Sequence, residues 1–82
     1  MSIVTEELLL QLTDCETLEE IRVISLRNKQ LKQCFKVLSS CPNLTIAYLQ
    51  NNLIMVKDLN FLHTFENLKK IDLSDNMIDN LP

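Results

Sequence analysis

Residues 68–78 read Leu-Lys-Lys-Ile-Asp-Leu-Ser-Asp-Asn-Met-Ile, and the frame of this stretch occurs twice earlier in the chain. The three frames are Ile21-x-x-Ile24-x-Leu26-x-x-Lys29-x-Leu31, Leu44-x-x-Ala47-x-Leu49-x-x-Asn52-x-Ile54 and Leu68-x-x-Ile71-x-Leu73-x-x-Asn76-x-Ile78. Corresponding positions lie 23 and then 24 residues apart, a period that is typical of solenoids built from stacked repeats. Because a solenoid presents a surface and normally has no catalytic cleft, the pattern favours a binding protein.

Composition limits the size of the folded domain and the kinds of partner that it can bind. With 82 residues, of which 46 % are apolar, the chain makes at most one small folded domain. Its net charge is −3 with the two signs interspersed, so there is no basic stripe that could bind phosphates. Direct binding to nucleic acid is therefore not expected.

The start of the chain and the cysteines indicate the compartment. Glu6 and Glu7 stand where a secretory signal needs positive charge, and the apolar run 8–10 is too short to span a bilayer. The chain has three cysteines, Cys15, Cys34 and Cys41, and their spacing is not that of a metal site. An odd number suggests free thiols, which we expect to be buried as small hydrophobic side chains. We expect an intracellular, cytoplasmic protein without membrane partners.

Residues alternate within each frame as they do in strands. This alternation predicts short strands near 23–26, 46–49 and 70–73 that stack into a parallel sheet, with every second side chain facing inward. Counting back three, six and nine residues from the start of each frame gives an apolar column, which predicts a helix or 3₁₀ segment behind each strand. The column comprises Leu12, Cys15, Leu18, Phe35, Leu38, Cys41, Leu59, Leu62 and Phe65.

The same reading predicts how the segments begin and end. Thr5 is a suitable N-cap for a helix over Glu6–Leu12, Asp58 for a helix that begins near Leu59, and Pro42 should end the helix before the second frame. Residues 1–20 are thus predicted to form an N-terminal helical cap, the return half of a partial first repeat.

The other end of the stack is expected to be open. The side chains without a covering layer would be those of Ile71, Leu73, Ile78 and Leu81. An open strand edge recruits other chains, so a partner or a second copy would cover it, or residues 1–82 are a truncated piece of a longer protein.

The pattern Leu-x-x-Leu-x-Leu-x-x-Asn-x-Leu is the leucine-rich repeat signature, and the chain resembles the short intracellular class of that family over residues 18–82. The resemblance implies an α/β fold, a short right-handed βα superhelix with a parallel sheet on its concave face. It would hold about two and a half to three repeats, at 21–43, 44–67 and an incomplete 68–82, after the cap at 1–20. The resemblance also leaves a nuclear or ciliary and centrosomal location open.

The family's asparagine forms a ladder by bonding backbone groups where the chain leaves each strand, and the resemblance gives this role to Asn52 and Asn76. Lys29 departs from the signature, and an ammonium group cannot accept a hydrogen bond. The departure is tolerable at the capped end, where one neighbour is missing, but it leaves the close packing of the first turn in question.

In this family the outward strand positions bind partners on the concave face. The positions that match are Val23, Ile46 and Lys70 in one row, Ser25, Tyr48 and Asp72 in the next, and Arg27, Gln50 and Ser74 in the third, with Asn28, Asn51 and Asp75 at the fringe. Ile46 and Tyr48 place an apolar and an aromatic side chain centrally on this face. With mixed charges around them, these residues suit a protein partner.

The remaining residues with reactive or metal-binding side chains do not form a recognisable catalytic pattern. His63 has no catalytic or metal partner in the sequence, and Asp72, Asp75 and Asp79 lack the spacing and the glycine of a calcium loop. Asn43-Leu44-Thr45 matches a glycosylation sequon, but Leu44 is expected to face inward. We therefore expect no enzyme, cofactor or metal. The favoured function is a protein–protein scaffold or adaptor, and the alternatives are a structural cap of a longer array or a regulatory subunit of an enzyme such as a phosphatase.

Overall fold

The computed structural model describes residues 4–78, in which helical segments and strands alternate along the chain. Its elements are α1 (Glu6–Thr13), η1 (Leu18–Glu20), β1 (Val23–Ser25), α2 (Phe35–Leu38), β2 (Ile46–Tyr48), η2 (Val56–Thr64) and β3 (Lys70–Asp72), where η denotes a 3₁₀ helix. In residues 4–78, no helix is long and apolar enough to cross a membrane.

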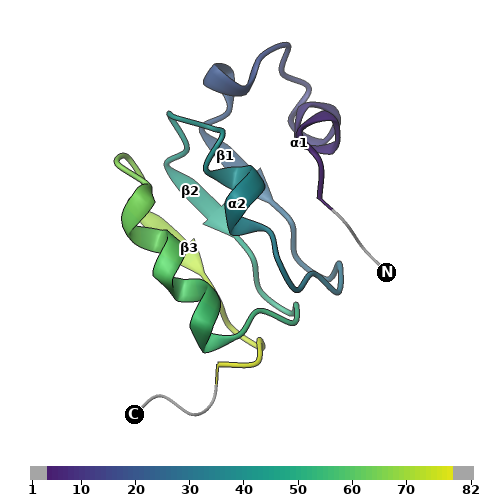
Figure 1. Ribbon diagram of the computed structural model, residues 1–82. Coiled ribbons are helices and arrows are strands. Elements are labelled where there is room, and N and C mark those ends of the chain that lie inside the picture. The colour runs from purple at the N-terminus through teal and green to yellow at the C-terminus, as the bar shows by residue number, and fades with distance from the viewer. Residues whose placement is uncertain (1–3, 79–82) are drawn as a thin grey trace.

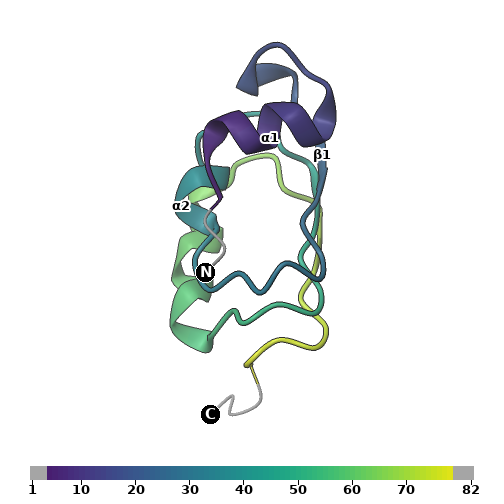
Figure 2. The same ribbon diagram turned by 90° about the vertical axis from the view of Figure 1, so that its right-hand side faces the viewer.

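The three strands form a parallel sheet in the order β1-β2-β3 (Figure 1). Ile24 pairs with Ala47, and Ala47 with Ile71, so equivalent positions of the three frames lie in register. Parallel neighbours need a crossover connection, and the segments that contain α2 and η2 supply it. Figure 2 shows these segments and the sheet on opposite sides of the molecule. The predicted parallel sheet is confirmed, with each strand one residue shorter than predicted.

The core lies between the sheet and the helical segments. Ile24 and Ala47 are buried, whereas Val23 and Ser25 on either side of Ile24 are exposed, which is the alternation that the sequence predicted. On the helical side, the rings of Phe35 and Phe65 meet edge to face with centroids 6.3 Å apart, a favoured aromatic geometry.

Burial falls from the first frame to the third. The apolar positions of frames 21–31 and 44–54 are buried, whereas Leu68, Ile71, Leu73 and Ile78 are half-buried. Within residues 4–78 the sheet ends at β3, so no further strand of this range lies beyond it. Leu81 and Asp79, which also entered the expectations, lie outside the described residues.

Helix α1 covers the β1 end of the sheet. The hydroxyl oxygen of Thr5 accepts a hydrogen bond from the Leu8 N–H at 3.1 Å, so Thr5 caps the helix as predicted. Leu9 is fully buried, but Leu12 is 44 % exposed, and its predicted inward position is wrong. The column assumed steps of three residues. An α-helix has 3.6 residues per turn, so the inner face of α1 runs from Leu9 towards Thr13 and leaves Leu12 outside.

Two predicted helix boundaries are also wrong. Asp58 does not precede a helix, because η2 already begins at Val56. Its carboxylate instead accepts a hydrogen bond from the Met55 N–H at 3.0 Å, as an acid in the first turn of a helix can. Helix α2 ends at Leu38, well before Pro42, since the Ser39 N–H closes it on the Phe35 carbonyl.

Candidate functional site

The outward side chains of the three strands form one surface, here called the sheet face. The register places Val23, Ile46 and Lys70 in one row and Ser25, Tyr48 and Asp72 in the next. Because side chains alternate along a strand, both rows point away from the core.

The third predicted row follows directly after the strands. There the Asn28 N–H donates to the Gln50 carbonyl at 3.2 Å, and the Asn51 N–H donates to the Ser74 carbonyl at 2.8 Å. These bonds keep the three chain segments aligned past the strand ends. Arg27 and Ser74 are exposed and Gln50 is half-buried, so the structure brings all nine predicted residues to this region.

An aromatic side chain lies in the middle of the sheet face. Tyr48, on the central strand, is half-buried, and the Lys70 ammonium lies 5.5 Å from the centroid of its ring. This is a cation–π distance. Val23 is 49 % exposed and Ile46 is half-buried in the adjacent row. The face thus offers a restrained aromatic ring beside accessible aliphatic surface.

The one acid on the sheet face is tied to its neighbour in the chain. Asp72 Oδ1 accepts from the Ser74 N–H at 3.0 Å and from the Ser74 hydroxyl at 2.7 Å. These two bonds, with a smaller contribution from Lys70, lower the pKa of Asp72 below its usual value. Asp72 therefore stays negative near the positive Lys70. With Arg27 on the β1 side of the same region, the face has mixed charge.

Asn52 connects the first two frames beneath this face. Its side chain is 4 % exposed. Its Oδ1 accepts from the N–H groups of Lys29 at 3.1 Å and Leu31 at 3.0 Å. Its Nδ2 donates to the carbonyls of Leu26 and Leu49, both at 2.9 Å. One buried amide therefore pairs backbone groups that would otherwise lose their bonds to water.

Asn76 connects the second and third frames in the same way. Its Oδ1 accepts from the Ile54 N–H at 3.0 Å, and its Nδ2 donates to the carbonyls of Leu49 at 2.9 Å and Leu73 at 3.0 Å. Each amide thus reaches back to the preceding frame, and Lys29 has no preceding frame to reach.

The first frame, residues 21–31, is tightly packed despite the departure at Lys29. Its apolar positions Ile21, Ile24, Leu26 and Leu31 are at most 1 % exposed. The doubt about its packing is therefore resolved, because the Lys29 N–H is satisfied by Asn52 from the next frame.

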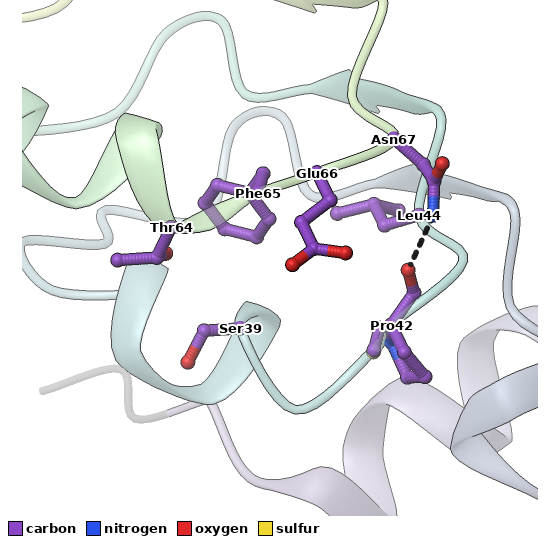
Figure 3. A pocket seen from close by; sticks show the side chains of 8 residues that line it. Ser39, Pro42, Leu44, Thr64, Phe65, Glu66 and Asn67 are labelled. Carbon is purple, nitrogen blue, oxygen red and sulfur yellow. Dashed lines mark hydrogen bonds between the residues drawn. The ribbon is translucent and has the colours of Figure 1, made fainter.

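A second pair of asparagines was missed by the sequence reasoning. Asn43 Nδ2 donates to the Glu19 carbonyl at 2.8 Å, and Asn67 Nδ2 donates to the Pro42 carbonyl at 2.9 Å (Figure 3). Both residues stand directly before the first apolar position of a frame, and this recurrence was the available signal. Asn43, considered before only as part of a sequon, therefore has a structural bond.

The fringe residues adopt a backbone conformation that turns the chain. Asn28, Asn51 and Asp75 have φ angles of 61°, 60° and 59°, in the left-handed region that asparagine and aspartate tolerate better than most residues. They turn the chain at the end of each strand, and the Asn51 amide also donates to Asn28 Oδ1. Sequence reasoning named them as the fringe of the binding surface and missed this conformational role.

The helical side holds a pocket of about 240 Å³ between the ends of α2 and η2. Figure 3 shows the Glu66 carboxylate directed into it between Ser39 and Pro42. The Cys41 thiol forms part of its wall, and burial, followed by Glu6 and Cys15, raises the pKa of that thiol. A protonated thiol is a poor nucleophile, and the volume is below that of most ligand sites. This pocket is therefore a weaker candidate than the sheet face.

Cys34 and His63 belong to the helical segments. Cys34 is buried at a second, smaller pocket, where burial and Asp58 raise its pKa to about 12, and His63 is exposed at the end of η2. Over residues 4–78, the structure shows no cluster of three or more His, Cys, Asp or Glu side chains that could hold a metal. Comparison of the chain with protein-family models gave no match, and comparison with curated proteins gave none either.

Proposed function

We propose that the chain is a leucine-rich repeat module and that its three frames are turns of a short solenoid. The positions of equivalent residues in the three frames support this proposal. The frames place their strands in one register, and Asn52 and Asn76 each bond the preceding frame. In that family the sheet lines the concave side, so the sheet face is the binding surface of this proposal.

The proposed function of the sheet face is to bind a protein partner. The observation that carries it is Tyr48, which lies centrally, is half-buried and is restrained by Lys70, next to accessible Val23 and Ile46. Aromatic residues in such positions are typical interface anchors, because they join a large contact area to a polar tip. The mixed charges of Arg27, Lys70 and Asp72 suit a protein surface better than a polyanion.

The proposed mechanism is preorganisation. The asparagine amides and the left-handed turns fix the backbone below the sheet face, and Lys70 restrains the ring of Tyr48. Ordering a free side chain at an interface costs about 0.5–1.5 kcal/mol. A face that is already ordered retains that amount for binding.

The test compares two aromatic truncations. Tyr48→Ala removes the proposed anchor, and Phe61→Ala is the matched control, since Phe61 is 42 % exposed on η2 in the opposite layer. Proteins captured from cell extract by the unmodified chain and by Phe61→Ala, but lost with Tyr48→Ala, are candidates, and each is then purified and titrated by calorimetry. We expect Tyr48→Ala to raise Kd more than tenfold, about 1.4 kcal/mol, with unchanged circular dichroism. An unchanged Kd would remove the sheet face as the binding surface.

A second candidate function is the terminal cap of a repeat array, and the packing of α1 favours it. Leu9 of α1 is fully buried, and α1 lies beside β1 (Figure 1), as a capping element must. The two candidates differ in one result. If this segment only caps an array, a longer protein that contains it keeps its partner after Tyr48→Ala and loses it when later repeats are deleted.

A further inference from the structure

The outer edge of β3 presents backbone donors whose equivalents are paired elsewhere in the sheet. The Leu26 N–H donates to the Tyr48 carbonyl at 2.8 Å, and the Leu49 N–H donates to the Asp72 carbonyl at 2.9 Å. Leu73 is the equivalent residue of the third frame. Within residues 4–78 the sheet ends at β3, so the Leu73 N–H points to the open side.

The same comparison identifies an acceptor. The Arg22 carbonyl accepts from the Thr45 N–H at 2.7 Å, and the Thr45 carbonyl accepts from the Lys69 N–H at 2.8 Å. The equivalent carbonyl of the third frame belongs to Lys69, and it faces the open side.

Ile71 completes the edge. The Lys70 N–H donates to the Thr45 carbonyl at 3.2 Å, and the Asp72 carbonyl accepts from Leu49, so both of these residues bond towards β2. Adjacent residues of a strand direct their backbone groups to opposite edges. The N–H and the carbonyl of Ile71 therefore both face outward from the sheet.

The side chains of this edge are self-complementary when the strand is reversed. In the sequence Lys70-Ile71-Asp72, the apolar residue stands between a cation and an anion. In an antiparallel pair of β3 strands with the two-fold axis at Ile71, each Lys70 lies opposite Asp72 of the second copy. Opposite charges placed directly across an antiparallel pair are stabilising. Ser74 occupies Oδ1 of Asp72, which leaves Oδ2 for this pairing.

We propose that two copies of this chain associate through β3 as an antiparallel, two-fold symmetric pair centred on Ile71. The two Ile71 residues exchange two hydrogen bonds, and each Leu73 N–H donates to the Lys69 carbonyl of the second copy. The half-buried side chains of Ile71 and Leu73 gain cover. The contact is isologous and closes at two copies. It joins two three-stranded sheets into one and pairs the open β3 edge of each copy. This inference does not depend on the proposed function of the sheet face.

The experiment measures the mass of the 82-residue chain by sedimentation velocity between about 1 and 200 µM. The unmodified chain is expected to shift from monomer to dimer. Lys70→Asp and Asp72→Lys each place like charges across the pair twice, and each should weaken dimerisation by about tenfold or more. An equimolar mixture of the two variants restores opposite charges and should form a heterodimer, and the double variant Lys70→Asp with Asp72→Lys should dimerise with itself.

Several results would overturn the proposal. These are a chain that stays monomeric over the whole range, association beyond two copies, or a double variant and a mixture that associate no better than the single variants. Asp72→Lys also removes the bonds to Ser74, so amide hydrogen exchange by NMR on the unmodified chain supplies a measurement that needs no variant. Exchange at Ile71 and Leu73 should slow as concentration rises, while exchange at Ser25 in β1 should not. Equal behaviour of these amides would contradict pairing at β3.

Discussion

Asn52 is the side chain whose removal should most clearly test the account of this fold. In Asn52→Ala the Leu49 carbonyl keeps its bond from Asn76, and the Lys29 N–H lies in a part-buried position that water can reach. The Leu31 N–H and the Leu26 carbonyl lose a buried partner. Each buried, unsatisfied group costs about 1–3 kcal/mol, so the expected loss is about 2–6 kcal/mol.

This loss is large for so small a chain. At about 0.05–0.15 kcal/mol per residue, a chain of 82 residues has a free energy of unfolding of about 4–12 kcal/mol. At about 4–8 °C per kcal/mol for a domain of this size, Asn52→Ala should lower the melting temperature by about 8 °C or more, or leave the chain unfolded at 25 °C. Urea unfolding followed by circular dichroism measures the loss, and the slope m checks that the same surface is exposed.

Two matched variants make the measurement specific. Asn76→Ala removes the same kind of amide from the half-buried third frame and should cost less, about 1–2 kcal/mol. Asn60→Ala changes an exposed residue of η2 and should stay within about 0.5 kcal/mol of the unmodified chain. The reasoning is refuted if Asn52→Ala loses less than 1 kcal/mol, or no more than Asn76→Ala.

Two further predictions concern the backbone turns and the buried thiols. Asn51 has a φ of 60°, and both Asn51→Gly and Asn51→Ala remove its bond to Asn28, so the difference between them isolates the left-handed conformation. Asn51→Ala should be less stable by about 1 kcal/mol or more in urea unfolding, and equal stabilities would contradict the assignment. The pKa of Cys34 is raised from 9.0 to about 12 and that of Cys41 is also raised. The unfolded chain therefore releases these protons first, and the free energy of unfolding should fall as pH rises from about 9 towards 12. Cys34→Ala should reduce this slope, and an identical slope in both proteins would show that the thiol is not the cause.

The sheet was predictable from sequence because its signal is local and repeated. Alternation of inward and outward residues has a period of two, and the 23- and 24-residue spacing brings equivalent positions together. The helical segments were predictable in place but not in type, because an apolar column with steps of three does not distinguish an α-helix from a 3₁₀ helix. The error at Leu12 comes from that ambiguity, whereas the error at Asp58 concerns the start of the helix, since Asp58 lies in the first turn of η2.

The candidate site was predictable in its residues and less so in its bonds. Val23, Ile46, Tyr48 and Lys70 follow from alternation alone, whereas the contact between Lys70 and Tyr48 depends on side-chain rotamers. The bonds of Asn43 to the Glu19 carbonyl and of Asn67 to the Pro42 carbonyl cannot be recognised from the neighbouring sequence. They show only as recurrence at one frame position.

The polar bonds between frames have a direction that links the two proposals. Asn52 and Asn76 each bond the backbone of the preceding frame. The first frame has no preceding frame to bond, so Lys29 can replace the asparagine there without loss of packing. The third frame is in the opposite situation. Its Leu73 N–H and Lys69 carbonyl are the groups that a following strand would satisfy, and its apolar side chains are only half-buried. A second copy paired at Ile71 satisfies these groups, and it also engages Lys70 and Asp72 at the rim of the sheet face. The tyrosine variant should therefore alter partner binding alone. The charge variants should alter self-association and, because Lys70 contacts Tyr48, partner binding as well.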